Sequence, residues 1–172
     1  MNVFLVGPMG SGKSAVGRQL AQRLALEFID SDAEIEARTG VDIAYIFERE
    51  GEAGFRSREA EVIDALSRRD RVLVSTGGGA ILDASTRERL RARGRVVYLR
   101  TSVDQQLART RRSNDRPLLN NDDPRGTLER LYEQRAPLYT EVAEFVVDTD
   151  GRKVKAVVDQ ICQRLGVDGL EP

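Results

Sequence analysis

The segment GPMGSGKS, at positions 7–14, has the residue types and the spacing that bind a polyphosphate. It matches the P-loop pattern G-x-x-x-x-G-K-[S/T] and lies between an apolar run and a helical pattern. Its glycines let backbone N–H groups approach phosphate oxygens at a helix N-terminus. Lys13 would place its charge between the β- and γ-phosphates, and Ser14 would offer its hydroxyl to Mg²⁺. The residues expected to bind ATP here are Gly10, Ser11, Gly12, Lys13, Ser14 and Ala15.

Two other classes of nucleotide-binding protein are weighed against this interpretation. A dinucleotide-binding fold would also place Gly10 and Gly12 after a strand, but Ala15 gives a poor G-x-G-x-x-G, and the Lys-Ser pair has no use in that fold. GTPases read guanine with an Asn-Lys-x-Asp element. None of the three lysines follows an asparagine, so that class is excluded.

Two aspartates follow the second apolar run, in the sequence Asp30-Ser31-Asp32. In extended backbone, residues i and i+2 share a face, so both side chains would point toward the phosphate site. Asp30 would then hold Mg²⁺ through water, and Asp32 would accept a proton or hydrogen bonds from an acceptor hydroxyl. The alternative is structural, with Asp32 or Ser31 capping a helix over residues 33–38.

The third apolar run ends in Ser75-Thr76 and three consecutive glycines at positions 77–79, which we call the glycine shelf. Hydrolytic P-loop ATPases usually have a magnesium-binding acid at such a strand end, and here it is missing. Bare backbone at the carboxyl edge of a sheet allows a ligand to lie directly against it. The glycine shelf is therefore a predicted substrate contact, and a plain loop is the alternative.

The composition limits the chemistry that the chain can perform. Histidine is absent, so acid–base work falls to carboxylates, and the single Cys162 lies in an apolar helical pattern that predicts a core position. The net charge of −1 does not favour nucleic-acid binding. The sequence opens directly into an apolar run with no signal-peptide pattern, and no apolar run approaches the roughly 18 residues that span a bilayer. We expect a cytoplasmic enzyme with no membrane contact.

Short Val-rich runs alternate with amphipathic helical patterns along the chain. This alternation predicts an α/β fold, a doubly wound five-stranded parallel sheet flanked by helices, in a single P-loop kinase domain over residues 1–172. A long polar stretch at residues 111–124 resists assignment and is the predicted mobile lid. The expected strands are 3–6, 27–29, 72–75, 96–99 and 145–147.

Taken together, the motifs resemble those of shikimate kinases, and the similarity covers nearly the whole chain. Each of the motifs stands where that family has its counterpart. Besides the P-loop and the aspartate pair, they are Gly54-Phe55-Arg56, Thr76-Gly77-Gly78-Gly79, Asp115-Arg116-Pro117-Leu118-Leu119 and Arg135-Ala136-Pro137-Leu138-Tyr139.

The resemblance implies a role for individual residues. Arg56 and Arg135 would grip the carboxylate of shikimate, a task that suits the planar guanidinium fork, and Glu59 would orient Arg56. Arg116, in the lid, would neutralise charge on the γ-phosphate, and Arg109 would stack on adenine. The implied shikimate-binding residues are Asp32, Arg56, Gly78, Gly79 and Arg135.

Arg152 is also expected to bind ATP, although the proline that the family often has after the fifth strand is missing here. The predicted catalytic residues are Lys13, Asp32 and Arg116, and the predicted metal ligands are Ser14 and Asp30. The implied reaction is transfer of the γ-phosphate of ATP to the 3-hydroxyl of shikimate by a monomer. A related kinase of another acceptor, such as gluconate or a nucleoside monophosphate, or a nucleotide-dependent regulatory module, is the alternative.

Overall fold

The computed structural model describes residues 1–110 and 122–167, and its centre is one parallel β-sheet. The strand order is β2-β3-β1-β4-β5. The predicted α/β fold is confirmed, because all five expected runs are strands and every pairing between them is parallel. The strands are β1 (Val3–Val6), β2 (Glu27–Asp30), β3 (Val72–Ser75), β4 (Arg95–Arg100) and β5 (Phe145–Asp148).

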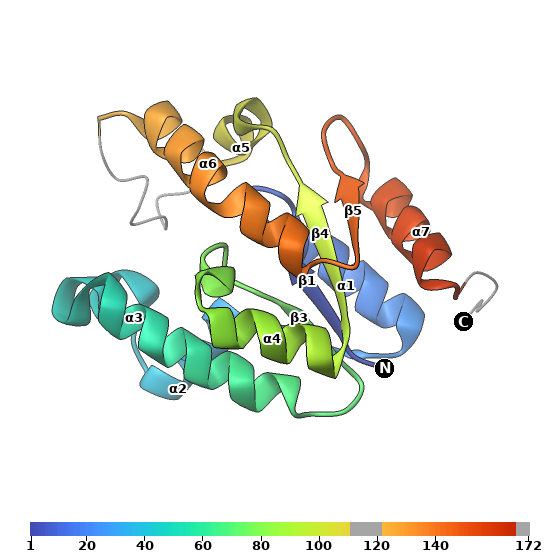
Figure 1. The fold of residues 1–172 in the computed structure, drawn as a ribbon, viewed down its shortest axis with the longest axis horizontal. Coiled ribbons are helices and arrows are strands. Elements are labelled where there is room, and N and C mark those ends of the chain that lie inside the picture. Colours follow the sequence, from blue (N-terminus) through green and yellow to red (C-terminus); the bar gives the residue numbers. More distant parts are fainter. Residues whose placement is uncertain (111–121, 168–172) are drawn as a thin grey trace.

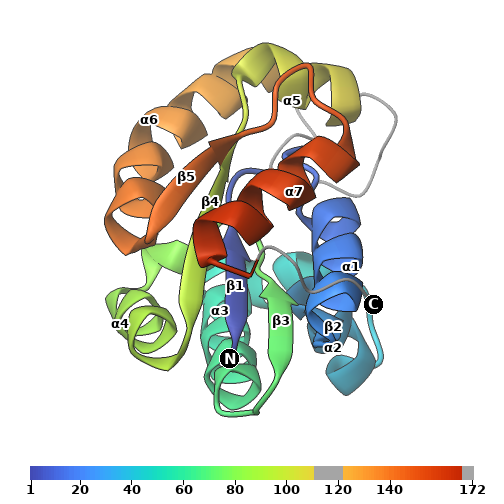
Figure 2. The same ribbon diagram turned by 90° about the vertical axis from the view of Figure 1, so that its right-hand side faces the viewer.

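Helices cover both faces of this sheet (Figures 1 and 2). One face packs against α1 (Lys13–Leu24) and α7 (Val154–Leu165). The other packs against α3 (Ile43–Ser67), α4 (Ala84–Arg93) and α6 (Pro124–Val142). The remaining helical elements are α2 (Ser31–Thr39), the short 3₁₀ turn η1 (Ala80–Leu82) and α5 (Val103–Thr110).

The central strand β1 explains why the sequence has continuous apolar runs. All four of its residues are fully buried. Successive side chains of a strand point to opposite faces, so Val3 and Leu5 join the core under α1 and α7, whereas Phe4 and Val6 join the core under α3, α4 and α6. Cys162 is buried in the first of these cores, as predicted.

The parallel topology brings three polar segments to the same edge of the sheet. In the strand register, Ser75 pairs with Leu5 on one side and with Asp30 on the other. The P-loop after β1, the aspartate at the end of β2 and the glycine shelf after β3 are therefore neighbours. This is the edge at which open α/β sheets bind their ligands.

Two helices, α2 and α3, connect β2 to β3 and lie beside this edge of the sheet. The side chain of Asp42 accepts a hydrogen bond from the Tyr45 N–H, at 2.8 Å, and caps α3. Gly51 then interrupts α3 with φ 71° and ψ −177°, a conformation that glycine adopts without strain, so α3 consists of two helical segments.

Within the described residues, no helix has the length and apolar character needed to cross a membrane.

Candidate active site

The P-loop connects β1 to α1 and has its phosphate-binding shape. Gly10 and Gly12 have φ values of 76° and 85°, which favour glycine, and Gly12 is the N-cap of α1. The Lys13 ammonium donates hydrogen bonds to the carbonyl oxygens of Gly7, at 2.7 Å, and Pro8, at 2.9 Å. Backbone N–H groups at the start of α1 and one ammonium group thus converge on this loop, an arrangement that attracts polyphosphate.

A hydrogen bond between Ser14 and Asp30 connects the P-loop to the end of β2. The Ser14 hydroxyl donates to Asp30 Oδ2 at 3.0 Å. Two hard oxygen donors lie side by side, which fits Mg²⁺. Among the described residues there is no group of three or more acidic, cysteine or histidine side chains that could hold a metal. A magnesium ion here would therefore take its other ligands from phosphate oxygens and water.

Asp30 also caps α2, which corrects two expectations about the aspartate pair. Its Oδ1 accepts hydrogen bonds from the N–H groups of Asp32, at 3.0 Å, and Ala33, at 3.1 Å. The capping residue is thus Asp30, and neither Ser31 nor Asp32. The prediction that both aspartates share a face of extended backbone was wrong, because the strand ends at Asp30 and Asp32 lies in the first turn of α2.

Asp32 nevertheless lies beside the glycine shelf, because β2 pairs with β3 and the start of α2 therefore adjoins the segment that follows β3. The Gly77 N–H donates to the Ser31 hydroxyl at 3.0 Å. A methyl group added to Gly77 would lie 2.9 Å from Asp32 Oδ1 and 2.7 Å from Glu59 Oε2. The shelf therefore contacts both carboxyl groups, and only glycine fits at position 77.

Arg56 and Glu59 form a pair on α3 next to the same shelf. Arg56 Nη1 donates to Glu59 Oε1 at 2.9 Å, and a methyl group added to Gly79 would overlap the Arg56 guanidinium. Burial raises the pKa of the Glu59 carboxyl to about 7, although the charge and hydrogen bond of Arg56 oppose the shift; the nearby Asp32 carboxylate adds to it. Glu59 is therefore a buried acid that titrates near neutrality.

Arg135 reaches the shelf from the opposite side, on α6. Only 4% of its surface is exposed. Its Nη1 lies 3.5 Å from the position that a methyl group on Gly78 would occupy, and the Met9 nitrogen of the P-loop lies at the same 3.5 Å from that position. The two arginines, the two acids and the P-loop thus line one region at the carboxyl edge of the sheet.

Arg109 lies over the P-loop from α5. Its Nη1 donates to the Gly10 carbonyl at 2.9 Å and lies 3.4 Å from the position of a methyl group on Gly12. Arg109 is therefore beside the expected phosphate and nucleotide site. Its stacking on adenine stays a prediction.

Comparison with known proteins decides the family. A family model described as shikimate kinase matches residues 9–166. The chain belongs to the shikimate kinase family. The shikimate kinase of Alteromonas mediterranea is 55% identical over 166 residues, which cover 96% of this chain and 97% of that protein. The shikimate kinase of Shewanella oneidensis is 57% identical over 165 residues, which cover 96% of each chain.

Solved structures agree with this assignment. The shikimate kinase from Acinetobacter baumannii, solved in complex with shikimate, superposes with a TM-score of 0.94 at 48% identity, covering 99% of this chain and 95% of that one. A deoxyadenosine kinase from M. mycoides, at 14% identity and a TM-score of 0.64, shares the fold alone. The predicted resemblance is confirmed, and the chain is a shikimate kinase homologue of the ATP-dependent kinase class.

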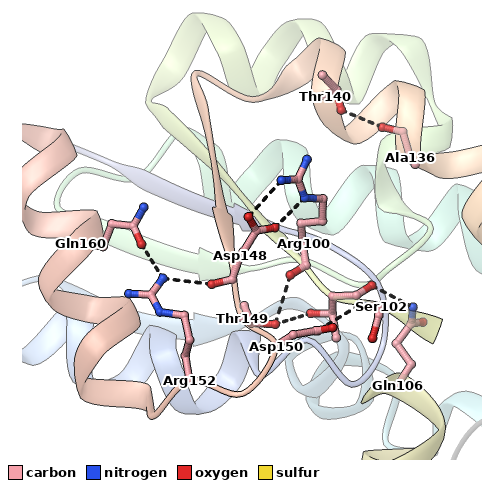
Figure 3. A network of polar contacts seen from close by, with 11 residues as sticks. Arg100, Ser102, Gln106, Ala136, Thr140, Asp148, Thr149, Asp150, Arg152 and Gln160 are labelled. Carbon is pink, nitrogen blue, oxygen red and sulfur yellow. Dashed lines mark hydrogen bonds and ion pairs between the residues drawn. The ribbon is translucent and has the colours of Figure 1, made fainter. Parts of the chain in front are cut away.

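Arg152 lies in the loop between β5 and α7, where the shikimate kinase resemblance places an ATP contact. Its guanidinium donates to the Asp148 carbonyl oxygen, at 3.0 Å, and to the Gln160 side chain (Figure 3). It also donates to the Ala156 carbonyl oxygen at 3.1 Å. In this structure the side chain thus ties the loop to the start of α7. A direct contact of Arg152 with ATP remains a prediction.

The same loop is joined to the loop after β4 by a small polar network (Figure 3). The Ser102 N–H donates to Asp150 at 3.0 Å, and the Thr149 hydroxyl donates to the Arg100 carbonyl at 3.1 Å. Arg100 and Asp148 form an ion pair on neighbouring strands. The network fixes the loop that follows β5 relative to the helix that carries Arg109.

Arg116 and most of the expected lid at 111–124 lie outside the described residues. Of that segment, the structure describes 122–124, where Asp123 caps α6 and Pro124 is its first residue. The role of Arg116 stays a prediction from the resemblance.

The sequence predicted only an orienting role for Glu59. It predicted no role for Tyr139, which lies on α6. The burial of Glu59 had no sequence signal beyond its spacing from Arg56. Tyr139 did have one, because it stands four residues after Arg135 in a quoted family motif, and this spacing places the two side chains on one face of a helix.

Proposed function

We propose that this chain transfers the γ-phosphate of ATP to the 3-hydroxyl of shikimate, giving shikimate 3-phosphate and ADP. The observation that carries the proposal is the convergence of Arg56, Arg135 and Asp32 on one glycine shelf beside the P-loop. Two guanidinium groups suit a carboxylate, and acids suit hydroxyl groups. This combination favours a small hydroxylated acid over a neutral sugar.

The phosphate donor would bind along the P-loop. Backbone N–H groups and Lys13 would hold the β- and γ-phosphates, with Arg109 beside them. Mg²⁺, held by Ser14 and, through water, by Asp30, would neutralise charge on the phosphate oxygens. Arg116, in the expected lid at 111–124, would add a further positive charge at the γ-phosphate.

The acceptor would lie on the glycine shelf with its carboxylate between the two arginines. Its 3-hydroxyl oxygen attacks the γ-phosphorus, a new P–O bond forms, and the bond between that phosphorus and the oxygen that leaves on ADP breaks. Asp32 is the group that orients the hydroxyl and accepts its proton if the proton is removed during transfer. Because the transition state of phosphoryl transfer is loose, the larger part of this role is orientation.

The assembly and the location of the enzyme are proposed with the same reasoning. We propose a monomer in a single domain, because the roles assigned above to the donor and the acceptor need no residue from a second chain. ATP as the donor supports a cytoplasmic enzyme. The proposed partners are ATP and shikimate, without nucleic acid or membrane.

A coupled assay of ADP release, run with Mg²⁺ and ATP, tests the acceptor. The panel contains shikimate, gluconate and AMP, and one series omits any acceptor. We expect acceptor-dependent release with shikimate and a kcat/KM for gluconate and AMP lower by at least about 100-fold. AMP has no carboxylate for the two arginines, and the open chain of gluconate does not hold its carboxylate and one hydroxyl at the fixed separation that a ring provides. Equal use of gluconate or AMP, or release that does not depend on an acceptor, would overturn the proposal.

A further inference from the structure

Tyr139 contacts the glycine shelf directly, from the inner face of α6. Its hydroxyl donates a hydrogen bond to the Gly78 carbonyl oxygen at 2.5 Å, and the side chain is 2% exposed. Burial raises the pKa of this hydroxyl well above its usual value, and the nearby charge of Arg135 opposes the shift only in part. The group therefore stays protonated and acts as a donor across the working pH range.

The Gly78 carbonyl belongs to the peptide that joins Gly78 to Gly79. In a planar trans peptide, the carbonyl and the following N–H point in opposite directions. A hydrogen bond that fixes the Gly78 carbonyl therefore also fixes the direction of the Gly79 N–H. Between two glycines such a peptide can rotate with little steric resistance, so an external anchor decides its orientation.

Tyr139 is itself held in place by its neighbours. Its ring stacks on the ring of Tyr98 from β4, with centroids 4.9 Å apart and an interplanar angle of 30°. Arg135 precedes Tyr139 by four residues on the same helix, so the two side chains share the face of α6 that meets the shelf. Tyr98 and Tyr139 thus form a buried stack that adjoins the glycine shelf.

We propose that Tyr139 is a positioning residue for the acceptor: it holds the Gly78–Gly79 peptide in the orientation that presents the Gly79 N–H to substrate beside Arg56. This inference rests on the proposed function, because it assigns the shelf to the acceptor. It predicts an effect on acceptor binding that leaves nucleotide binding unchanged.

The test is Tyr139→Phe, which deletes the hydroxyl and keeps the stacked ring. Loss of one buried hydrogen bond at the shelf should raise the KM for shikimate about 3- to 10-fold, with the KM for ATP within about twofold of the original. The matched control is Tyr98→Phe. Tyr98 is 1% exposed in the same stack, but its hydroxyl has no hydrogen-bond partner among the described residues, so its deletion should leave both constants unchanged.

A second pair of variants covers the case in which Tyr139→Phe does not fold. Replacing Tyr139 by 4-aminophenylalanine restores an N–H donor and should recover most of the shikimate affinity. Replacing it by 4-fluorophenylalanine fills the same space without a donor and should not. Equal shikimate constants for this pair, or the same KM change in Tyr98→Phe as in Tyr139→Phe, would overturn the role of Tyr139 alone. An unmodified chain that does not use shikimate would overturn the proposed function first.

Discussion

Glu59 shows how a single buried carboxyl group links the site to the stability of the fold. Burial is the main cause of its pKa of about 7, which lies above the ordinary glutamate value of 4.5. Between these two pH values, the unfolded chain has lost the proton while the folded chain still holds it. The folded state therefore binds more protons, and the contribution of Glu59 to stability falls as the pH rises through this window.

We predict that Glu59→Gln becomes more stable relative to the original chain as the pH rises. The difference in free energy of unfolding should grow between about pH 5 and about pH 7.5, by at most about 1.4 kcal/mol per pH unit. Urea unfolding at several pH values measures it. Glu61→Gln, at an exposed position on the same helix, is the control and should show a difference that does not change with pH. A constant difference for Glu59→Gln would contradict the assignment.

Glu59 lowers the stability of the fold as the pH rises, but it also orients an arginine of the candidate site. Its carboxylate accepts the hydrogen bond that holds Arg56 against the glycine shelf, at 2.9 Å. An arginine with a buried acid beside it keeps one orientation, and a pre-oriented guanidinium loses less entropy when it binds a carboxylate. We infer that the site keeps this acid in spite of its effect on stability.

Between β2 and α2, the side chain of Asp30 has two separate tasks, one for each of its carboxylate oxygens. Asp30 Oδ1 caps the helix that carries Asp32, and Asp30 Oδ2 accepts from the Ser14 hydroxyl of the P-loop. The cap requires only an oxygen acceptor, which asparagine also supplies. A site for Mg²⁺ gains from the negative charge. The two tasks are therefore separable by mutation.

Asp30→Asn should keep the helix and weaken the proposed Mg²⁺ site. We expect a thermal midpoint within about 2 °C of the original, because the cap is retained. The Mg²⁺ concentration for half-maximal activity should rise at least about 10-fold, because a charged oxygen ligand becomes neutral. Asp42→Asn makes the same chemical change at the cap of α3, away from the P-loop, and should leave the Mg²⁺ requirement unchanged. A matching change in both variants would refute the metal assignment.

At the scale of the whole molecule, the sequence predicts the sheet well and the site only in outline. The strand at Val3–Val6 is recovered with its exact bounds, because burial on both faces demands a continuous apolar run. The strand order has no such local signature. The direction in which the Asp32 side chain points depends on where β2 ends, because a shift of one residue at that end changes the face to which the side chain points.

Long-range contacts limit the prediction of the site in the same way. The spacing of Arg135 and Tyr139 is visible in the sequence, but their common contact with Gly78 exists only once α6 packs over the end of β3. The pKa of Glu59 likewise depends on burial among residues that are distant along the chain. Motifs thus identify which residues act, and the fold decides which of them act together.

The acceptor would add contacts between three parts of the fold, since Arg56 lies on α3, Arg135 on α6 and the glycine shelf after β3. Shikimate at about 100 times its Kd should therefore raise the free energy of unfolding by about 2.7 kcal/mol, or roughly 5 to 10 °C in the thermal midpoint. Arg135→Ala removes a charge-assisted contact and should lower affinity about 10- to 100-fold, so the same shikimate concentration should give about half of that shift or less. Arg91→Ala, at an exposed arginine of α4, is the control and should keep the full shift. Differential scanning fluorimetry with and without shikimate measures both, and an undiminished shift in Arg135→Ala would show that the carboxylate binds elsewhere.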